Sequence, residues 1–349
     1  MRVKIYGAGS IGNHLSHAAR VLGYSVDLCD IDPAALSRTR DSIYPGRYGK
    51  WDDAIKLHRV GEEPKGGFDR IFIGTPPDSH VRLARAALAE RPAALIIEKP
   101  LCPPDLRGVD ALAAEATIPV FVGYDHVVGQ AAERAAEVLA SGAIGEVLAI
   151  DVEFREYWGG IFAAHPWLCG PADSYLGFWR RGGGALGEHS HALNLWQFFA
   201  HVCGAGPVAS VQAQLHYVAD GRVDYDSLAF LNLVTASSVP GRVAQDVVTA
   251  PPRKWARVQG MKGYVEWHCG YEPGVDAVKY QAGNEPAQTL RFPKTRPDDF
   301  IRELQHIDAA MKSPAQSPLR LERGIETMRV IAAAHESHAR GSRITLNHG

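Results

Sequence analysis

A glycine-rich segment close to the amino terminus has the residue types that hold a dinucleotide. The run Gly7-Ala8-Gly9-Ser10-Ile11-Gly12 follows the apolar stretch Val3–Tyr6 and precedes a helical pattern that reaches about Leu22. In a strand–loop–helix unit the first glycine permits a tight turn, the second admits a pyrophosphate, and the third allows close packing. The helix start adds free N–H groups and partial positive charge. The residues expected to bind the cofactor here are Gly7, Gly9, Ser10, Ile11 and Gly12.

An acidic residue stands where the ribose of such a cofactor would lie. Asp30 comes eighteen residues after Gly12, at the end of a second predicted strand, Tyr24–Asp30. A carboxylate there accepts hydrogen bonds from ribose hydroxyls and repels a 2′-phosphate, and no arginine follows directly. NAD is therefore favoured over NADP. The alternative is that Asp30 or Asp32 caps a helix starting at Pro33; Asp32 can be the cap while Asp30 binds the ribose.

The elements that would position these residues alternate between strand and helix in the first third of the chain. Short apolar strands followed by helices predict a doubly wound α/β domain with a parallel sheet. The predicted elements after Asp30 are strands Asp69–Gly74, Ala94–Glu98 and Pro119–Gly123 and helices Val81–Leu88 and Asp110–Ala116. Ligands bind at the carboxyl ends of such strands, which is where Lys99 stands.

The remainder of the chain has longer strand-like segments, several with alternating polarity, which predicts a mostly antiparallel sheet. A sheet with one uncovered apolar face would be an interaction surface. The predicted strands are Val147–Phe154, Val208–Val218, Leu228–Thr235, Arg242–Val248 and Trp255–Cys269.

Composition limits the classes of protein that the chain can be. Its 349 residues, 46% hydrophobic and 22% charged, fit a folded protein of two domains. The net charge of −2 gives no electrostatic reason to expect nucleic acid or a membrane surface as partner. No apolar run reaches the ~20 residues of a membrane span, and none resembles a signal peptide. The five cysteines contain no CxxC pair, so neither a disulfide framework nor a cysteine zinc site is expected, and a cytoplasmic location is favoured.

Several motifs together resemble the Gfo/Idh/MocA family of nicotinamide-dependent oxidoreductases. Besides the glycine loop they are the Gly74–His80 segment, Glu98-Lys99-Pro100 and the glycine-rich run Gly182–His191. A helix over Gly324–Ser337 and a Gly341–Leu346 tail are similar to the family's ending. The resemblance implies a Rossmann domain over residues 1–123 and an α+β domain with a large open, mostly antiparallel sheet over residues 124–349, with the last helix packing back on the first domain. It also implies a homodimer or homotetramer formed through that open sheet.

The resemblance also implies roles for individual residues. Lys99 and His191 would handle the proton that leaves or joins the reacting oxygen, and both would contact the substrate. General acid–base catalysis of this kind is typically worth 10²–10⁴-fold in rate. The further residues that the resemblance places at the cofactor are Thr75, Pro76, Pro77, His80, Glu98 and Lys99 itself.

The sequence departs from the family's usual pattern at two places. The aspartate usually found four residues before the histidine is Gly187 here, and Glu188 is the candidate replacement, because on one helix Glu188 and His191 would share a face. The alternative is that Glu188 only balances the charge of a helix start. The arginine often found after the last parallel strand is absent; Asp125 or His126 would face the substrate instead, unless they only form a turn between the domains.

Three further groups allow more than one interpretation. Trp179 could stack on a sugar ring, or it could fill a domain interface. Arg180 could bind an anionic group of the substrate, or it could face solvent. Glu188, His189 and His191 are metal-ligand types, but alternating histidines do not share a helical face, so no metal site is expected.

The sequence thus predicts an NAD-dependent dehydrogenase or reductase acting on a secondary alcohol or ketone. The substrate class implied by the resemblance is a sugar, nucleotide sugar or cyclitol. The alternatives are a redox-neutral NAD-dependent glycosidase or epimerase, which would produce no net NADH, and a non-catalytic NAD(H)-binding regulator, which would not need Lys99 and His191 together.

Overall fold

The computed structural model describes residues 1–346 and divides the chain into two compact units. Unit 1 consists of Met1–Cys102, Arg107–Asp125 and Arg296–Gly324. Unit 2 consists of Pro103–Leu106, His126–Thr295 and Ile325 onward. The division that follows the first part of the chain comes after Asp125, and the later segment Arg296–Gly324 belongs to unit 1 again.

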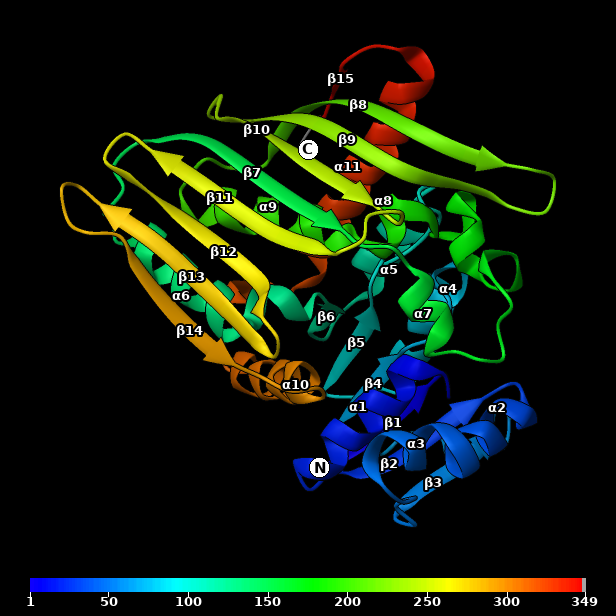
Figure 1. The fold of residues 1–349 in the computed structure, drawn as a ribbon. Coiled ribbons are helices and arrows are strands. Elements are labelled where there is room, and N and C mark those ends of the chain that lie inside the picture. Colours follow the sequence, from blue (N-terminus) through cyan, green and yellow to red (C-terminus); the bar gives the residue numbers. More distant parts are fainter. Residues whose placement is uncertain (347–349) are drawn as a thin grey trace. The chain divides into compact units, whose positions relative to one another are not determined.

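Unit 1 is built on a six-stranded parallel sheet with the order β3-β2-β1-β4-β5-β6, drawn in blue and cyan in Figure 1. Its strands carry nearly continuous apolar runs, as expected for a parallel sheet buried on both faces. The residues of β1, β4 and β5 that are fully buried include Ile5, Ile71 and Leu95. The strands are β1 (Arg2–Tyr6), β2 (Ser25–Asp30), β3 (Ile55–Arg59), β4 (Arg70–Ile73), β5 (Ala94–Glu98) and β6 (Val120–Gly123).

The helices of unit 1 pack on this sheet. Helix α1 packs on β1 and β2 and also on α10, whose buried face includes Phe300 and Leu304, while α4 packs on β4, β5 and α5. The helices are α1 (Ser10–Val21), α2 (Pro33–Arg38), α3 (Tyr44–Tyr48), α4 (Pro77–Leu88), α5 (Val109–Glu115) and α10 (Asp298–Ala310), with a π-helical turn at Thr39–Ile43.

The register of the parallel strands decides what meets at one edge of the sheet. Tyr6 is paired with Ile73, and Glu98 is paired with Gly123. All four residues end their strands, so the segments that follow leave the sheet at the same edge. The glycine loop, the loop at Thr75 and Lys99 are thereby brought to the carboxyl edge of this sheet.

Unit 2 is built on a nine-stranded sheet with the order β14-β13-β12-β11-β7-β10-β9-β8-β15. Every neighbouring pair is antiparallel except β7 and β10, so the sheet is mostly antiparallel, as predicted. The strands are β7 (Val147–Arg155), β8 (Val208–Ala219), β9 (Asp224–Thr235), β10 (Pro240–Asp246), β11 (Arg253–Gly260), β12 (Gly263–Glu272), β13 (Val275–Ala282), β14 (Gln288–Pro293) and β15 (Ile344–Thr345).

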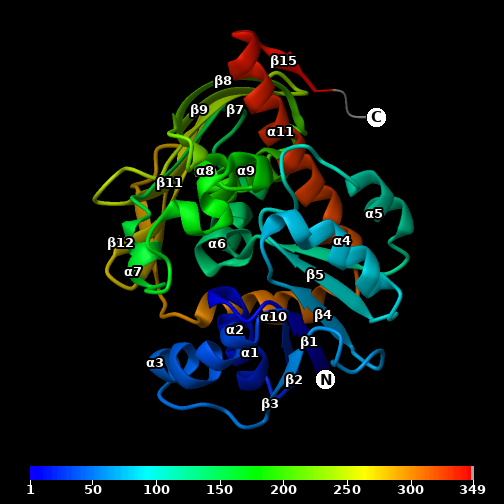
Figure 2. The ribbon, with the colours of Figure 1, turned by 90° about the vertical axis from the view of Figure 1, so that its right-hand side faces the viewer.

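The longer helices of unit 2 gather on one face of this sheet, as Figure 2 shows. Helix α9 packs on β7 and β10, α6 packs on β12 and β13, and the backbone of β8 donates hydrogen bonds to side chains of α11. The helices are α6 (Gln130–Ala140), α7 (Gly159–Ala163), α8 (Gly184–Glu188), α9 (Ser190–Val202) and α11 (Leu321–Arg340), whose first residues belong to unit 1. Single 3₁₀ turns lie at Asp125–Val128, Pro171–Asp173, Tyr175–Gly177, Trp179–Arg181 and Pro314–Gln316.

The other face of the sheet carries cross-strand ion pairs. Arg242 pairs with Asp151 across β10 and β7, and Arg257 pairs with Glu266 across β11 and β12. Phe230 of β9 is 44% exposed. This face therefore carries charged side chains, with apolar side chains only at isolated positions. The uncovered face considered from the sequence was apolar instead.

One predicted strand is wrong in its extent. The segment Trp255–Cys269 was expected to be a single strand, but it lies in the two strands β11 and β12, joined by a turn at Met261 and Lys262. Gly260 pairs with Gly263 at the end of this hairpin. The apolar alternation continues on both sides of the turn, so the sequence pattern does not reveal it.

No helix within residues 1–346 is long and apolar enough to cross a membrane. The five cysteines are free thiols in this structure.

Candidate active site

The glycine loop has the geometry of a dinucleotide cradle. It connects β1 to α1, and Gly9 at its tip is exposed with open space where a Cβ would point. At Gly12 a Cβ would lie 1.8 Å from the carbonyl oxygen of Gly7, so any side chain there would force the helix away from the loop. The loop is braced from outside, because Asn13 Nδ2 donates to Gly9 O at 2.9 Å and Thr39 Oγ1 donates to Ala8 O.

Asp30 lies at the end of β2 beside this loop. Its Oδ2 accepts a hydrogen bond of 2.7 Å from Ala8 N, and its Oδ1 accepts one of 2.9 Å from Asp32 N. Asp32 caps α2 by accepting from Ala34 N at 2.9 Å. Asp32 is therefore the helix cap, as one of the alternatives from the sequence had it, while the partly exposed Asp30 carboxylate is held beside the glycine loop.

The Thr75–Pro77 segment follows β4 and leads into α4. His80, on the first turn of that helix, is fully buried and its burial lowers its pKa. Its ring nitrogens lie 2.6 Å from Thr75 O and 3.0 Å from Pro100 O. His80 therefore ties the Thr75 loop to the segment that follows Lys99, which is a positioning role at the edge of the sheet.

Lys99 is half-buried directly after β5, while Glu98 before it is buried inside unit 1. Burial and the charge of Asp125 raise the pKa of Glu98 to about 8. Glu303 of α10 joins these two carboxyl groups; it is 1% exposed, and burial raises its pKa well above the ordinary value. Within unit 1 the sheet edge next to Lys99 therefore holds two carboxyl groups, those of Glu98 and Glu303, that favour their protonated forms.

The glycine-rich run folds into a short helix that leads to His191. Asp226 of β9 is fully buried, and its Oδ2 accepts a hydrogen bond of 2.7 Å from Leu186 N in α8. Gly184 has φ +75°, and a Cβ there would lie 2.0 Å from Asp226 Oδ1. Gln245 of β10 donates to Ala185 O at 3.2 Å. Strands β9 and β10 therefore hold α8 through buried polar side chains, and only glycine fits above Asp226.

The expectation of one helix across Glu188 and His191 is wrong. Helix α8 ends at Glu188, His189 has φ −97° and ψ 25°, and α9 begins at Ser190. The chain changes direction between the two residues, so the three-residue spacing no longer places them on one helical face.

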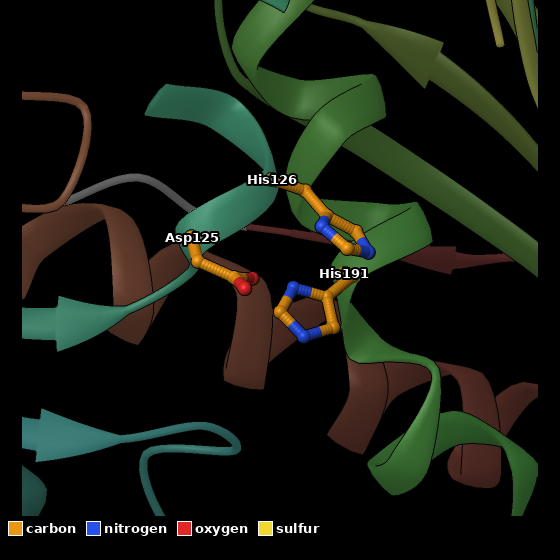
Figure 3. Close-up of side chains that lie close together, drawn as sticks. All are labelled: Asp125, His126 and His191. Atoms are coloured by element: carbon orange, nitrogen blue, oxygen red, sulfur yellow. The ribbon is translucent and has the colours of Figure 1, made fainter. Parts of the chain in front are cut away.

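Figure 3 shows His191 next to His126 and Asp125. The rings of His126 and His191 have centroids 4.4 Å apart, and His126 also contacts Phe154 at 5.4 Å. Phe154 stacks on Trp267 at 5.7 Å, and these two rings are almost completely buried. The two partly exposed imidazoles therefore lie side by side, with His126 against a buried aromatic wall.

The same residues have the donor types of a metal site. One ligand atom from each of Asp125, His126 and His191 lies within 4.8 Å of the others. The set differs from the one weighed in the sequence, because Asp125 and His126 take the places of Glu188 and His189.

Trp179 and Arg180 lie in another part of unit 2. Trp179 stacks on His335 of α11 at 4.3 Å, and Tyr217 OH lies 2.6 Å from His335 Nδ1. Burial lowers the pKa of His335 to about 3. Arg180 forms an ion pair with Asp224 and lies over the Trp179 ring. These contacts attach Trp179 and Arg180 to α11 and β9, whereas the group around His191 contains neither of them.

Three buried residues of the site region have no signal in the sequence. Asp226, Gln245 and Glu303 are polar side chains at inward positions of β9, β10 and α10. Only Gln245 stands in a predicted strand, Arg242–Val248, and the partners of all three residues are far away in the chain.

Comparisons with known proteins agree with this fold. Residues 1–124 match a family model described as an oxidoreductase family with an NAD-binding Rossmann fold. Residues 132–266 match the model of the GFO/IDH/MocA C-terminal domain. A search of curated protein sequences finds no match.

Solved structures of similar fold include an oxidoreductase from Agrobacterium radiobacter in complex with NAD+, L-tartaric acid and magnesium. It is 21% identical over 99% of this chain and 98% of its own, with a TM-score of 0.77. The WlbA dehydrogenase from Bordetella pertussis, in complex with NADH and UDP-GlcNAcA, is 16% identical over 100% and 99%, with a TM-score of 0.72. The aldose-aldose oxidoreductase from Caulobacter crescentus, complexed with glycerol, is 18% identical over 99% of both chains, with a TM-score of 0.75.

Proposed function

Since the chain belongs to the Gfo/Idh/MocA family of NAD-binding oxidoreductases, we propose that it transfers hydride between NAD(H) and a secondary alcohol or ketone. The proposed substrates are sugars, nucleotide sugars or cyclitols. This class is supported by the similarity of fold to proteins solved with a nucleotide sugar or named for aldoses. The observation that carries the proposal is the strand register of unit 1, which brings Lys99 to the same sheet edge as the glycine loop.

The residues of the loop fit the cofactor. The amide groups at the start of α1 would bind the pyrophosphate, and the Asp30 carboxylate would accept the adenosine ribose hydroxyls. Thr75, Pro76 and Pro77 would line the nicotinamide side. Once bound, NAD supplies the acceptor for the hydride that leaves the carbon bearing the hydroxyl. The orientation of Asp30 by Ala8 N also favours NAD over NADP, because a 2′-phosphate would meet a carboxylate.

The protein's own side chains act on the proton of the substrate hydroxyl group. Oxidation of a secondary alcohol removes a hydride from carbon and a proton from oxygen. Lys99 Nζ would hydrogen-bond the reacting oxygen and accept its proton, and it would return the proton in the reverse direction. His191 would hold the substrate oxygen or exchange the proton with Lys99. His126, in contact with His191, and Asp125 would bind neighbouring hydroxyl groups of the substrate.

A panel of sugars, cyclitols and nucleotide sugars, assayed with NAD and NADP for reduced cofactor, tests the proposal. The Lys99→Met variant should bind NADH as the wild type does and lose about 10²–10⁴-fold in turnover. Full activity of this variant would exclude the proposed role of Lys99. Substrate conversion without net NADH would instead indicate a redox-neutral enzyme, and NADH binding without any turnover would indicate a regulator.

We also propose that the chain forms a homodimer or homotetramer through the uncovered face of its nine-stranded sheet. The exposed Phe230 on that face supports this assignment. Light scattering tests this proposal by measuring the molar mass of the wild type and of the Phe230→Asp variant. The wild type is expected to be oligomeric and the variant monomeric.

A further inference from the structure

An arginine that the sequence analysis did not single out contacts the cofactor loop. Arg47, in α3, donates from Nη1 to Ser10 O at 2.9 Å and from Nη2 to Ser10 Oγ at 2.7 Å. Ser10 is the first residue of α1 and part of the glycine loop. The guanidinium is half-buried, and it has five N–H donors, of which these contacts use two. It therefore adds a fixed full charge to the partial charge of the helix start.

A second guanidinium lies near the first. Arg296 lies with its Cζ 5.4 Å from the centre of the Phe300 ring, and Phe300 stacks on His14 at 4.8 Å. His14 Nδ1 in turn lies 2.6 Å from the hydroxyl of Tyr48, the residue after Arg47. His14 is one helical turn beyond Ser10, so both arginines flank the same face of the first turns of α1.

Neither arginine is neutralised by an acidic side chain among residues 1–346. Arg47 and Arg296 form no ion pair with a carboxylate there, whereas Arg40 of the same unit pairs with Asp41. Burial and the neighbouring charge of Arg296 lower the pKa of Arg47. The two like charges repel one another, Arg47 is half-buried while Arg296 is exposed, and a bound anion at this place would relieve the repulsion.

We propose that Arg47, supported by Arg296, binds the pyrophosphate of the dinucleotide cofactor at the start of α1. The inference rests on the proposed function, since it takes the glycine loop as the NAD site. In this arrangement the Ser10 hydroxyl and carbonyl orient the guanidinium, and its remaining N–H groups meet phosphate oxygens. Arginine suits this role because its fork of donors matches two oxygens of a phosphate.

The 2′-phosphate of NADP is the competing occupant for these charges. The ribose end of the site is occupied by the Asp30 carboxylate, which Ala8 N and Asp32 N hold in place. Arg47 instead contacts Ser10, at the start of α1 where a pyrophosphate lies in this fold. The geometry therefore favours the pyrophosphate, and a comparison of NADH with NADPH separates the two.

The test measures binding of NADH, ADP-ribose and NADPH to the full chain by calorimetry at several salt concentrations. Arg47→Met should weaken NADH and ADP-ribose by about 10- to 100-fold, as expected for the loss of a charge-assisted contact, and should reduce the salt dependence of both. Arg47→Lys keeps the charge and should lose less affinity for NADH and ADP-ribose than Arg47→Met does. Arg296→Gln should also lose less affinity than Arg47→Met. Arg40→Gln, an exposed arginine paired with its neighbour Asp41, is the matched control and should bind as the wild type does.

Each result decides the question. A Kd of Arg47→Met for NADH within twofold of the wild type overturns the inference, as does a loss confined to NADPH or one with unchanged salt dependence. Thermal unfolding, monitored by circular dichroism, shows whether Arg47→Met is misfolded. If it is, the affinities and salt dependence of Arg47→Lys and Arg296→Gln are compared with those of the wild type instead. Because the readout is binding, wild-type protein that binds NADH but oxidises no substrate contradicts only the proposed function.

Discussion

Asp226 accepts a hydrogen bond of 2.7 Å from the backbone N–H of Leu186, so that a buried carboxyl of β9 holds the helix that precedes His191. The contact joins residues forty positions apart and is closed over by Gly184, where a Cβ would lie 2.0 Å from the carboxyl. Burial raises the pKa of Asp226 to about 8. The helix that precedes the candidate catalytic histidine is thus anchored by a buried carboxyl group that favours its protonated form.

Asp226 should make the stability of the protein depend on pH. Its pKa is higher in the folded chain than the ordinary value of 3.8, so the folded state binds the proton more tightly. The resulting stabilisation is fully present below pH 3.8 and is lost as pH rises to about 8. Asp226→Asn imitates the protonated form and should gain on the order of 2–5 kcal/mol relative to the wild type between pH 5 and pH 8. Urea unfolding of both proteins at the two pH values measures this difference, and equal pH profiles would contradict it.

His191 and His126 should differ in which kinetic constant they affect. If His191 handles the proton, His191→Asn should lower kcat by about 10²-fold or more. His126→Asn should mainly raise KM for the substrate, since a hydroxyl contact is lost. Steady-state kinetics of both variants, with NADH binding as the control for folding, tests the assignment. The reverse split would exchange the two roles.

Asp30 should set the preference for NAD. Asp30→Ala removes both the acceptor for the ribose hydroxyls and the repulsion of a 2′-phosphate. We expect the Kd for NADH to rise about 10-fold, while the Kd for NADPH rises less or falls. Fluorescence titration with the two reduced cofactors measures the ratio. Asp32→Ala is the matched control, because Asp32 caps α2 and should affect stability rather than this ratio.

The reaction should proceed without a metal ion, although Asp125, His126 and His191 have metal-ligand types and lie close together. Proton transfer by an amine and an imidazole completes the proposed chemistry. Protein dialysed against EDTA should keep its activity, and elemental analysis should find less than one equivalent of zinc or manganese. Stoichiometric metal with activity lost on its removal would assign these side chains to a metal site instead.

The sequence determined those features that depend on local spacing. The glycine loop, Asp30 and the cap at Asp32 lie within one strand–loop–helix–strand unit, where the order of residues fixes their relative places. The length and alternation of apolar segments predicted the parallel sheet and the mostly antiparallel sheet. The location of Lys99 at the carboxyl edge of the parallel sheet was predicted from its position directly after a buried strand.

The tertiary structure decided everything that depends on contacts between distant segments. Four such features join residues that the sequence leaves far apart: the neighbours of His191, the carboxyl that holds α8, the electrostatic effect of Glu98 on Glu303, and the contact of Arg47 with Ser10. The break between Glu188 and His191 belongs with them, because α8 is anchored to β9 and β10 while α9 packs on β7 and β10. A spacing of three residues predicts a shared helical face only while the helix continues, and packing against other strands decides whether it does.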